Sequence, residues 1–509
     1  MKHLGVDRRL RNLLSAVRVI REYPINKANC NRENRDRAWC KMIAKWGEIR
    51  VREIAGAVCG RLVSGSGNRL VGGLSTDTRQ MSPGDAFWAL KGERYDGHDF
   101  LKEAVSKGAA CVVVDRGISR KIVADKEVST IQVRDTLRAL GDFARWWRHQ
   151  RGACVAAITG SVGKTSTKEM VYQILSLSEE PLKNKGNFNN LVGLPLSIFN
   201  MRPGQRRAVL EMGMNRPGEI ARLTEIADPD IGVITKIGKA HLEGVGDLAG
   251  VVKAKTELIE KISKESQVIL NGDDAILMEA AAHFSREFLT FGLGEDNQVR
   301  AGDVEPRGTE GVIFNLKLPG AESKIRLSVP GIHNVYNALG AAAIAFCMGE
   351  PMENVVAGLE MYRGVPGRFM ITRLANGGIL IDDTYNSNPA SLRAAMESVR
   401  RLPAAGGRII VGLGDMLELG NNAREAHLEA GRMVAEVGAS HFIALGNHAH
   451  DMIEGAMEKG LPRERTILVN NHDEMVEALS ETVRSGDLVL LKASRKIGLD
   501  RVASTLRDI

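Results

Sequence analysis

The stretch Thr159-Gly-Ser-Val-Gly-Lys-Thr-Ser166 decides the fold of this 509-residue chain. The apolar run Cys154–Thr159 leads into it and predicts a strand, and the apolar residues between positions 170 and 175 recur at helical spacing. A strand, a glycine-containing turn and a helix in direct succession are typical of an α/β sheet, in which ligands gather beyond the carboxyl ends of the strands. The stretch therefore predicts where ligand chemistry takes place.

Two glycines and a lysine give this turn the features of a phosphate-binding loop. Gly160 and Gly163 allow a tight turn in which backbone N–H groups converge on phosphate oxygens at the start of a helix. Lys164 would add positive charge at the terminal phosphates, and Thr165 would place its hydroxyl on Mg²⁺. The spacing is GxxGKT instead of the general GxxxxGK(S/T), because position 158 is Ile, so a plain glycine-rich turn stays as the alternative. The expected nucleotide-binding residues are Gly160, Ser161, Gly163, Lys164, Thr165 and Ser166.

The pattern around this loop predicts an α/β protein with more than one domain. From residue 151 apolar strands alternate with amphipathic helices, which predicts a mostly parallel, doubly wound sheet. A break at Gly364-Val-Pro-Gly367 precedes a second alternating series, which predicts a separate α/β domain. The expected strands are Cys154–Thr159, Ala208–Glu211, Ile231–Thr235 and Val268–Asn271 in the first series, and Ile379–Asp382, Arg408–Leu413, Phe442–Leu445, Thr466–Val469 and Leu488–Lys492 in the second.

The net charge of +7 belongs to the N-terminal segment. Residues 1–41 contain 11 of the 69 Lys/Arg and 4 of the 62 Asp/Glu, which leaves 58 of each in the remainder. The globular part therefore has no excess of positive charge, and this argues against nucleic acid as a partner. We expect residues 1–46 to be a basic extension that is disordered, or upstream sequence preceding a true start at Met42, with membrane-surface contact as the alternative.

The sequence also indicates a cytoplasmic protein. No stretch approaches the roughly 18 apolar residues of a transmembrane helix, and arginines at positions 8, 9, 11 and 18 interrupt any signal-peptide core. The six cysteines lie far apart without a CxxC pair, which argues against a zinc site or a disulfide framework and fits a reducing compartment.

Glu211 could complete a metal site, and two further polar side chains follow it in the sequence. Glu211 ends the second expected strand, where a carboxylate can reach Mg²⁺ held by nucleotide phosphates. His241 follows the third strand, and Lys255 lies in an expected helix after it. Taken alone, such a histidine is more often structural and such a lysine more often a solvated charge.

In combination, these motifs resemble the Mur ligase superfamily. Thr159–Lys168, Gly186-Asn-Phe-Asn-Asn190, Glu211, His241 and Lys255 occur in the order and context of that family. The resemblance implies ATP as the nucleotide, two Mg²⁺ ions, and CO₂ bound as a carbamate on Lys255. The metal ligands that it implies are Thr165, Glu211, His241 and carbamylated Lys255, and the catalytic residues are Lys164, Asn190, His241 and Lys255.

The resemblance extends to segments outside the phosphate loop. The run Ser75-Thr-Asp-Thr-Arg79 and the run Gly92-Glu-Arg-Tyr-Asp-Gly-His98 look like the family segment that receives a UDP-sugar. It implies substrate binding by Ser75, Thr76, Asp77, Thr78, Arg79, Asp96 and His98, and nucleotide binding by Asn334, Asn337, Arg368 and Asp382. Asp383 resembles a further hinge or nucleotide-facing group of the family.

Two C-terminal runs narrow the acceptor. Asp382-Asp-Thr-Tyr-Asn-Ser-Asn-Pro389 and Gly414-Asp-Met-Leu-Glu-Leu-Gly420 are similar to the family members that add D-alanyl-D-alanine, with Asn386 and Asn388 as implied substrate-binding residues. The Asp-Tyr-Ala-His-Thr-Pro and Asp-Asn-Pro-Arg runs of the ligases that add the third peptide residue are absent. Two positions depart from the family pattern: Lys236 replaces an asparagine, and Ala493 replaces a glycine that could require positive φ.

The resemblance implies a three-domain Mur ligase architecture. We expect a small N-terminal α/β UDP-sugar domain at 47–150, a central P-loop ATPase-like doubly wound sheet at 151–365 and a C-terminal Rossmann-like α/β domain at 366–509. The implied activity is ATP-dependent ligation of D-alanyl-D-alanine to UDP-N-acetylmuramoyl-tripeptide by a monomer, through an acyl phosphate, in peptidoglycan synthesis. A ligase with another acceptor and a nucleotide switch remain the alternatives, and neither the third tripeptide residue nor the base for the amine follows from the sequence.

Overall fold

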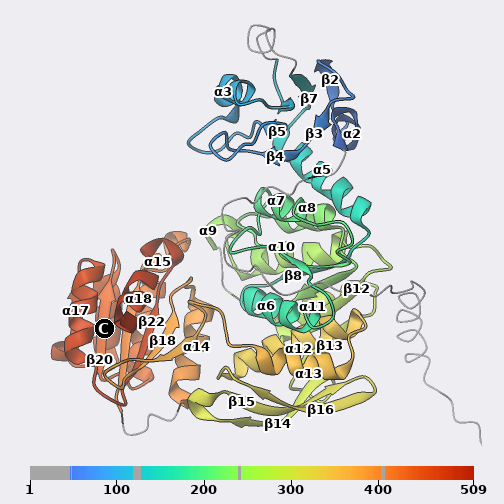
Figure 1. Ribbon diagram of the computed structural model, residues 1–509. Helices are drawn as coiled ribbons and strands as arrows, with labels where there is room; N and C mark the ends of the chain where they lie inside the picture. The colour runs from blue at the N-terminus through green and yellow to red at the C-terminus, as the bar shows by residue number, and fades with distance from the viewer. Residues whose placement is uncertain (1–45, 47–48, 118–127, 239–241, 403–406, 509) are drawn as a thin grey trace, which may run out of the picture.

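Three sheets organise the computed structural model of the protein, which describes residues 46, 49–117, 128–238, 242–402 and 407–508 (Figure 1). The predicted extension therefore lies outside the described residues, except Trp46. That side chain is 4% exposed, so residue 46 already belongs to the packed body. Within the described residues, no helix is long and apolar enough to cross a membrane.

The N-terminal region carries a five-stranded sheet in the order β2-β7-β6-β5-β4. The pairs from β4 to β7 are parallel, whereas β2 runs antiparallel to β7. A short ribbon of β1 and β3 and the helices α2 and α3 complete the region. The bounds are β1 Ile49–Arg50, α2 Val51–Ala57, β2 Arg61–Ser64, β3 Leu70–Val71, β4 Gly73–Ser75, β5 Asp85–Trp88, α3 Leu101–Ser106, β6 Cys111–Val114 and β7 Ser129–Gln132.

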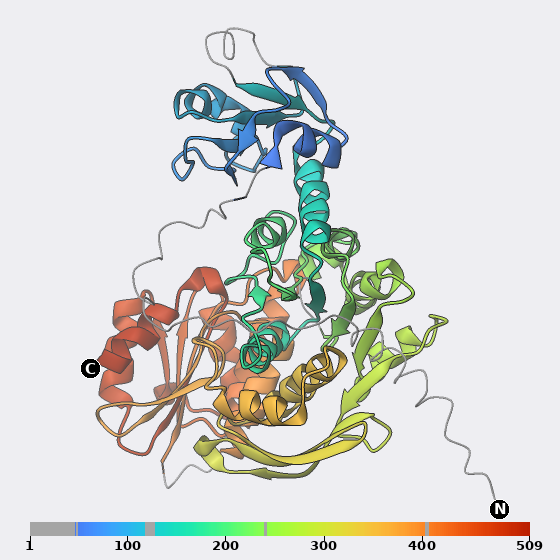
Figure 2. The same ribbon diagram turned by 45° about the vertical axis from the view of Figure 1, so that its right-hand side comes forward.

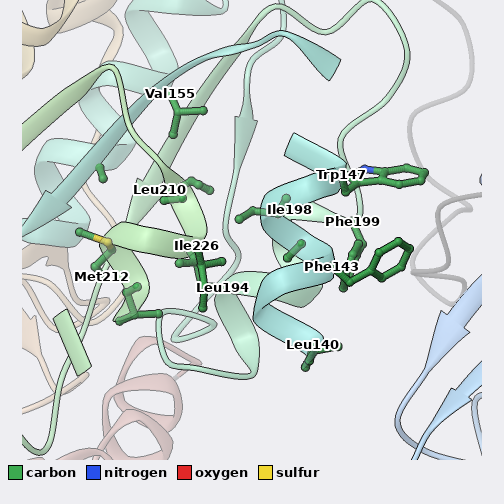
Figure 3. Packing of buried hydrophobic residues seen from close by; sticks show 14 of the residues in the cluster. Leu140, Phe143, Trp147, Val155, Leu194, Ile198, Phe199, Leu210, Met212 and Ile226 are labelled. Carbon is green, nitrogen blue, oxygen red and sulfur yellow. The ribbon is translucent and has the colours of Figure 1, made fainter. Parts of the chain in front are cut away.

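One long helix, α5 (Thr136–Arg151), joins this region to the central one (Figure 2). The Asp135 side chain caps its start by accepting a hydrogen bond from the Arg138 N–H, and Gly152 ends it in the left-handed conformation. Figure 3 shows Phe143 and Trp147 projecting from α5 beside Phe199. Trp46 packs on the same rings, with ring centroids 5.0–5.4 Å apart. This aromatic cluster fixes the N-terminal region on the central sheet, since burial of each such ring contributes roughly 1.5–3 kcal/mol.

The central region is built on a nine-stranded sheet in the order β16-β15-β14-β13-β12-β11-β8-β10-β9. Its parallel part confirms the four predicted strands, and α6 and α12 pack together on one face. The antiparallel strands β14–β16 extend it in a way that we did not predict. The strands are β8 Cys154–Thr159, β9 Leu182–Lys183, β10 Arg207–Glu211, β11 Ile231–Ile234, β12 Gln267–Asn271, β13 Leu289–Gly292, β14 Val299–Pro306, β15 Val312–Leu318 and β16 Ala321–Leu327. The helices are α6 Lys164–Leu175, α7 Gly193–Ile198, α8 Glu219–Ala227, α9 Leu242–Val245, α10 Leu248–Lys261, α11 Ala275–Ala281, α12 Ile332–Cys347 and α13 Met352–Met361.

The C-terminal region carries a six-stranded sheet in the order β17-β18-β22-β19-β20-β21, parallel except for the β17–β18 pair. All five predicted strands are present, with ends that differ by at most one residue. The strands are β17 Met370–Arg373, β18 Ile379–Asp383, β19 Ile409–Gly414, β20 His441–Leu445, β21 Thr466–Val469 and β22 Leu488–Lys492. The helices are α14 Pro389–Arg401, α15 Ala423–Glu436, α16 Ala449–Glu458, α17 His472–Thr482 and α18 Asp500–Asp508.

Candidate active site

The turn between β8 and α6 needs glycine at two positions for different steric reasons. Gly160 has φ 144°, and a Cβ there would lie 2.1 Å from the Thr235 hydroxyl. Gly163 has φ 92°, and its Cβ would lie 2.5 Å from Asn337 Oδ1. The loop is thus packed against the end of β11 and against α12, which leaves its backbone N–H groups at the start of α6 for a ligand.

Side chains inside the loop hold its shape. The Lys164 ammonium donates a hydrogen bond to the Gly160 carbonyl (2.7 Å), and Ser161 Oγ donates to the Gly238 carbonyl (2.8 Å). The Ser161 N–H donates to the Lys236 carbonyl (2.7 Å). Burial lowers the pKa of Lys164, opposed by the Glu211 carboxylate. A terminal phosphate would offset the same burial and stabilise the charged ammonium.

Glu211, at the end of β10, accepts hydrogen bonds from α6 and from the loop between β9 and α7. Thr165 Oγ1 donates to its Oε2 (2.9 Å), and Asn189 Nδ2 donates to its Oε1 (2.9 Å). Burial alone would raise the pKa of Glu211, but Lys164 and Lys168 outweigh it and lower the pKa. A hydroxyl and an ionised carboxylate in contact are ligands that suit Mg²⁺ beside nucleotide phosphates.

Sequence reasoning missed two residues that orient Glu211. Asn184 pairs with both backbone groups of Glu211, at 2.9 Å for each hydrogen bond. The buried Lys168 ammonium donates to the Asn184 carbonyl and lies 3.7 Å from the Glu211 carboxylate. Lys168 lies on the buried face of α6. It follows Thr165 by three residues, and residues at this spacing share one face of a helix, so the sequence could have predicted that Lys168 lies near the site.

Lys255 lies on α10 and is fully buried. Among the described residues, no hydrogen-bond partner approaches its Nζ atom. Burial, reinforced by the positive charge of Lys164, lowers the pKa of Lys255 well below its usual value. A buried amine without a partner costs free energy and keeps its lone pair, so it is poised for a covalent or coordinated group that the protein alone does not supply.

Of the predicted site residues His241 and Asn190, the structure describes only Asn190. His241 lies outside the described residues, and the described part of the chain holds no group of three or more His, Cys, Asp or Glu side chains that could bind a metal. Asn190 is exposed, and its Oδ1 accepts hydrogen bonds from the N–H groups of Val192 and Gly193 at the start of α7. The preceding residue, Asn189, is thus the one that contacts Glu211, whereas Asn190 accepts hydrogen bonds from the backbone at the start of α7.

A cavity of about 960 Å³ opens beside the loop, between the central and C-terminal regions. Asn334 and Asn337, predicted to bind nucleotide, line it together with Ser166 and Arg368. Asn337 Nδ2 donates to Asn334 Oδ1 (3.2 Å), and Asn334 Nδ2 donates to the Pro330 carbonyl (2.8 Å). The volume, and a mostly apolar lining with a few convergent polar groups, are those of a small-molecule site.

Arg368 connects the C-terminal region to the phosphate loop. Its Nη2 donates to Thr165 Oγ1 (3.3 Å), and its Cζ lies 4.0 Å from the centre of the Tyr385 ring. Its Nε is buried without a hydrogen-bond partner among the described residues. An unpaired donor next to Thr165 is suited to an anionic ligand.

The two aspartates at the end of β18 face different surroundings. Asp382, the predicted nucleotide-binding residue, accepts hydrogen bonds from Thr384 and from the Arg507 side chain. Asp383 lines the cavity and pairs with the buried Lys492 ammonium (2.6 Å). The residue that reaches the cavity is therefore Asp383.

The loops after β18, β22 and β19 meet at one edge of the C-terminal sheet. Asn388 caps α14 by accepting from the Ser391 N–H, whereas the Asn386 carbonyl accepts from Lys492 Nζ (2.9 Å). The Ser494 N–H donates to the Asp415 carbonyl (3.0 Å), which joins two of these loops. Ala493 does not have a positive φ. A Cβ atom added to Gly414 would lie 2.9 Å from the Cβ of Ala493. This chain therefore accommodates Ala493 without left-handed strain.

The predicted UDP-sugar residues lie beyond the carboxyl ends of β4 and β5. Asp77 binds the Arg79 guanidinium through both carboxylate oxygens, and Ser75 Oγ donates to the Asp77 carbonyl (2.8 Å). Arg79 is exposed, Thr76 is half-buried, and the Thr78 carbonyl accepts from Lys107. These contacts present one guanidinium at the sheet edge, which suits a diphosphate.

His98 is buried between two carboxylates at the same edge. Its Nδ1 lies 2.7 Å from Asp96 Oδ1, and its Nε2 lies 3.2 Å from Asp115 Oδ1. Hydrogen bonds from His98 lower the pKa of Asp96 to about 2, and the bond from the His98 backbone N–H has the largest effect. His98 thus ties the loop after β5 to the loop after β6, and it is a positioning residue for that edge.

Known protein families match three segments of the chain. The Mur ligase family catalytic domain matches residues 70–148, the Mur ligase middle domain matches 158–345, and the Mur ligase glutamate ligase domain matches 367–495. A protein from Bacillus subtilis named UDP-N-acetylmuramoyl-tripeptide--D-alanyl-D-alanine ligase is 34% identical over 457 residues, which cover 90% of this chain and 98% of that relative.

Two solved structures share the arrangement of the three regions. A crystal structure of MurF from Acinetobacter baumannii matches with a TM-score of 0.81 at 32% identity, covering 91% of this chain and 100% of that one. The MurF ligase from Thermotoga maritima in complex with ADP matches with a TM-score of 0.76 at 29% identity, covering 86% of this chain and 97% of that one.

Proposed function

This chain belongs to the Mur ligase family, and from that membership we propose that it joins D-alanyl-D-alanine to UDP-N-acetylmuramoyl-tripeptide with ATP. The observation that carries the proposal is the cavity beside the phosphate loop, lined by Asn337, Arg368 and Asp383 from two regions of the chain. The acceptor comes from the names of relatives that the chain covers almost completely.

The proposed reaction has two steps. A terminal carboxylate oxygen of the tripeptide forms a bond to the γ-phosphorus of ATP while the bond from that phosphorus to the β-phosphate oxygen breaks, which gives an acyl phosphate and ADP. The dipeptide amine then forms a bond to the acyl carbon, phosphate leaves, and the amine loses a proton. Both steps bring anions together, so positioning and neutralisation of charge are the main tasks of the protein.

The chain supplies several groups for these tasks. The N–H groups at the start of α6 and the Lys164 ammonium bind phosphate oxygens, and the unpaired Arg368 Nε takes an anionic oxygen beside them. Thr165 and Glu211 fit a Mg²⁺ site because they are in contact and Glu211 is ionised. Bound Mg²⁺ supplies charge neutralisation for the phosphates. His241 is proposed as a further ligand.

The Lys255 amine fits a carbamate. CO₂ reacts with an unprotonated amine, and the lowered pKa of Lys255 favours that form. The product would replace a partnerless amine by a longer anionic group, on which the charges of Lys164 and Glu211 act. This change would reverse the unfavourable interaction with Lys164, and it accounts for a lysine at a fully buried position.

The N-terminal region is proposed to hold the UDP-sugar at the edge formed by Arg79, Asp96 and His98. The proposed domains are residues 47–150, 151–365 and 366–509, with the qualification that the buried Trp46 joins the first. We place the reaction in the cytoplasm, where ATP and nucleotide-activated sugars are made, and propose that a monomer suffices because the cavity is lined within one chain.

The direct test is phosphate release from ATP with Mg²⁺ and UDP-N-acetylmuramoyl-tripeptide, with and without D-alanyl-D-alanine. A ligase should release phosphate in strong dependence on the dipeptide and yield the UDP-muramoyl-pentapeptide, identified by mass. Tripeptides with diaminopimelate or lysine at the third position determine the donor. Turnover without either cosubstrate would favour a nucleotide switch, and turnover with single amino acids would reassign the acceptor.

A further inference from the structure

Two residues at the edge of the C-terminal sheet remain outside the nucleotide cavity and the metal site. Tyr385 follows β18, and Arg495 follows β22, the strand that pairs with β18 in parallel. Ligands of parallel sheets bind beyond the carboxyl ends of the strands, so both residues stand where a substrate of this region would lie.

The Tyr385 ring contacts two guanidinium groups. Arg368 Cζ lies 4.0 Å from the ring centre, and Arg495 Cζ lies 5.4 Å from it. Arg368 in turn donates to Thr165 of the phosphate loop. The three side chains therefore form a continuous series from the phosphate loop to the outer face of the C-terminal region, with Arg495 at its far end.

The acceptor in the proposed reaction has a matching polarity and length. D-alanyl-D-alanine must bring its amine to the acyl carbon beside the phosphate loop, while its carboxylate stays about two residues, or roughly 7 Å, away. That carboxylate must be held by a cation, because the ATP phosphates at the phosphate loop repel it. Arginine suits this task since it can bind a carboxylate through two parallel hydrogen bonds.

Two other cations near this edge, Lys492 and Arg368, have partners of their own. Lys492 is buried in its ion pair with Asp383 and in a hydrogen bond to the Asn386 carbonyl. Arg368 contacts Thr165 at the phosphate end. The Arg495 side chain is 56% exposed, and its ion pair with Asp500 engages one nitrogen, Nη1, of a group with five N–H donors.

We propose that Arg495, held in place by the Tyr385 ring and Asp500, binds the terminal carboxylate of the acceptor dipeptide. The inference rests on the proposed function, because it identifies where that acceptor binds. Asp500 neutralises part of the arginine charge but also fixes the side chain, so less conformational entropy is lost when the acceptor arrives. The site selects a free carboxylate at the end of the acceptor and rejects a neutral one.

The test pairs two acceptors with three enzymes. D-alanyl-D-alanine and D-alanyl-D-alaninamide, which lacks the negative charge, are compared in kcat/KM for the wild type, Arg495→Met and Lys496→Met. The wild type should prefer the free carboxylate by roughly 10- to 100-fold, the usual range for a charge-assisted hydrogen bond. Arg495→Met should accept both with less than about threefold preference through a raised KM for the dipeptide, and KM for ATP should not change.

The control and a second variant keep the result decisive. Lys496 is the next residue and is exposed, so Lys496→Met removes the same charge and should keep the wild-type preference. Arg495→Lys, which retains charge but not the two-pronged geometry, should lie between the wild type and Arg495→Met. The inference is overturned if the wild type accepts the amide equally well, or if Arg495→Met, folded as judged by ADP binding, keeps the preference. A wild type without turnover of either acceptor would instead refute the proposed function.

Discussion

The Arg368 guanidinium donates a hydrogen bond to the Thr165 hydroxyl across 3.3 Å, although 203 residues separate the two in the chain. The Thr165 hydroxyl in turn donates a hydrogen bond to Glu211 Oε2, so the first residues of the C-terminal region contact the centre of the phosphate site. The connecting segment contains three residues with positive φ, at Gly364, Gly367 and Phe369. We propose that this segment is a hinge that moves the C-terminal region when a nucleotide binds; unchanged small-angle scattering with all substrates bound would contradict a large movement.

Replacing Arg368 by Met should lower kcat/KM for ATP by about 100-fold, because a buried charged donor beside the phosphates is lost. Arg368→Lys should recover only part of that loss, since one ammonium cannot both contact Tyr385 and reach Thr165. Steady-state kinetics and ADP titration measure the effect. Arg363→Met, in the same connection but bonded to Ser328 and Glu360, is the control. Equal effects of the two Met variants would show that only net charge matters.

Gly163→Ala should damage nucleotide binding more than backbone strain explains. Gly163 (φ 92°, ψ −18°) and Gly218 (φ 86°, ψ −16°) precede α6 and α8 in the same conformation. A Cβ at Gly163 lies 2.5 Å from Asn337 Oδ1, whereas a Cβ at Gly218 meets nothing within 4 Å. The positive φ alone should cost both alanine variants about 1 kcal/mol of stability, and the clash with Asn337 should add to the loss in Gly163→Ala. Only Gly163→Ala should weaken ADP binding, by roughly 10-fold or more. Calorimetric titration with ADP measures the affinity of both variants. An unchanged ADP affinity in Gly163→Ala would contradict the steric account.

Much of this fold follows from short sequence patterns. The strand Cys154–Thr159 matches the prediction at both ends, because Gly152 ends α5 two residues before the apolar run and Gly160 follows it directly. The antiparallel strands β14–β16 escaped prediction, although the alternating burial of β15 and the Pro319-Gly320 turn before β16 carried the signal. The alternation of strands and helices that indicates a parallel sheet does not indicate antiparallel hairpins such as these.

The active site was harder to assign at the level of single residues. The sequence indicated Asn190, whereas Asn189 contacts Glu211; it indicated Asp382 and Asp383 together, and of these two Asp383 lines the cavity. A shift by one residue reverses the side to which a strand residue points, and a loop has no period that would identify its inward side chain. Long-range pairs such as Arg368 and Thr165 leave no local pattern at all.

Lys255→Ala should lose activity by about 100-fold or more if the amine is the precursor of a carbamate. Small carboxylic acids added to the variant should restore part of the activity, because they can supply the missing anionic group. Independently of activity, bicarbonate labelled with carbon-13 should give a carbamate resonance in the wild type that is missing in the variant. The control is Lys253→Ala on the same helix, at an exposed position. A fully active Lys255→Ala enzyme would rule out the carbamate.

The stability of the protein should fall between pH 7 and pH 5 through His333. Burial lowers the pKa of His333 to about 4, with Asp383 opposing and Lys492 reinforcing the shift. Its Nδ1 lies 3.0 Å from Ser398 Oγ on α14, which already donates to the Ala394 carbonyl, so neutral His333 is the donor. The unfolded chain takes up a proton near pH 6.5 and the folded chain does not, so stability is full above pH 6.5 and is lost as pH falls toward 4. The loss by pH 5 is about 2 kcal/mol.

Urea unfolding at both pH values, followed by tryptophan fluorescence, measures this dependence. His333→Gln keeps a donor for Ser398 but cannot take up a proton, so its unfolding free energy should depend less on pH by about 2 kcal/mol over this interval. His283→Gln, at an exposed histidine, should follow the wild type. The opposite sign, with the wild type gaining stability at pH 5 relative to His333→Gln, would mean that the contact between α12 and α14 favours protonated His333. The burial argument for this interface would then be wrong.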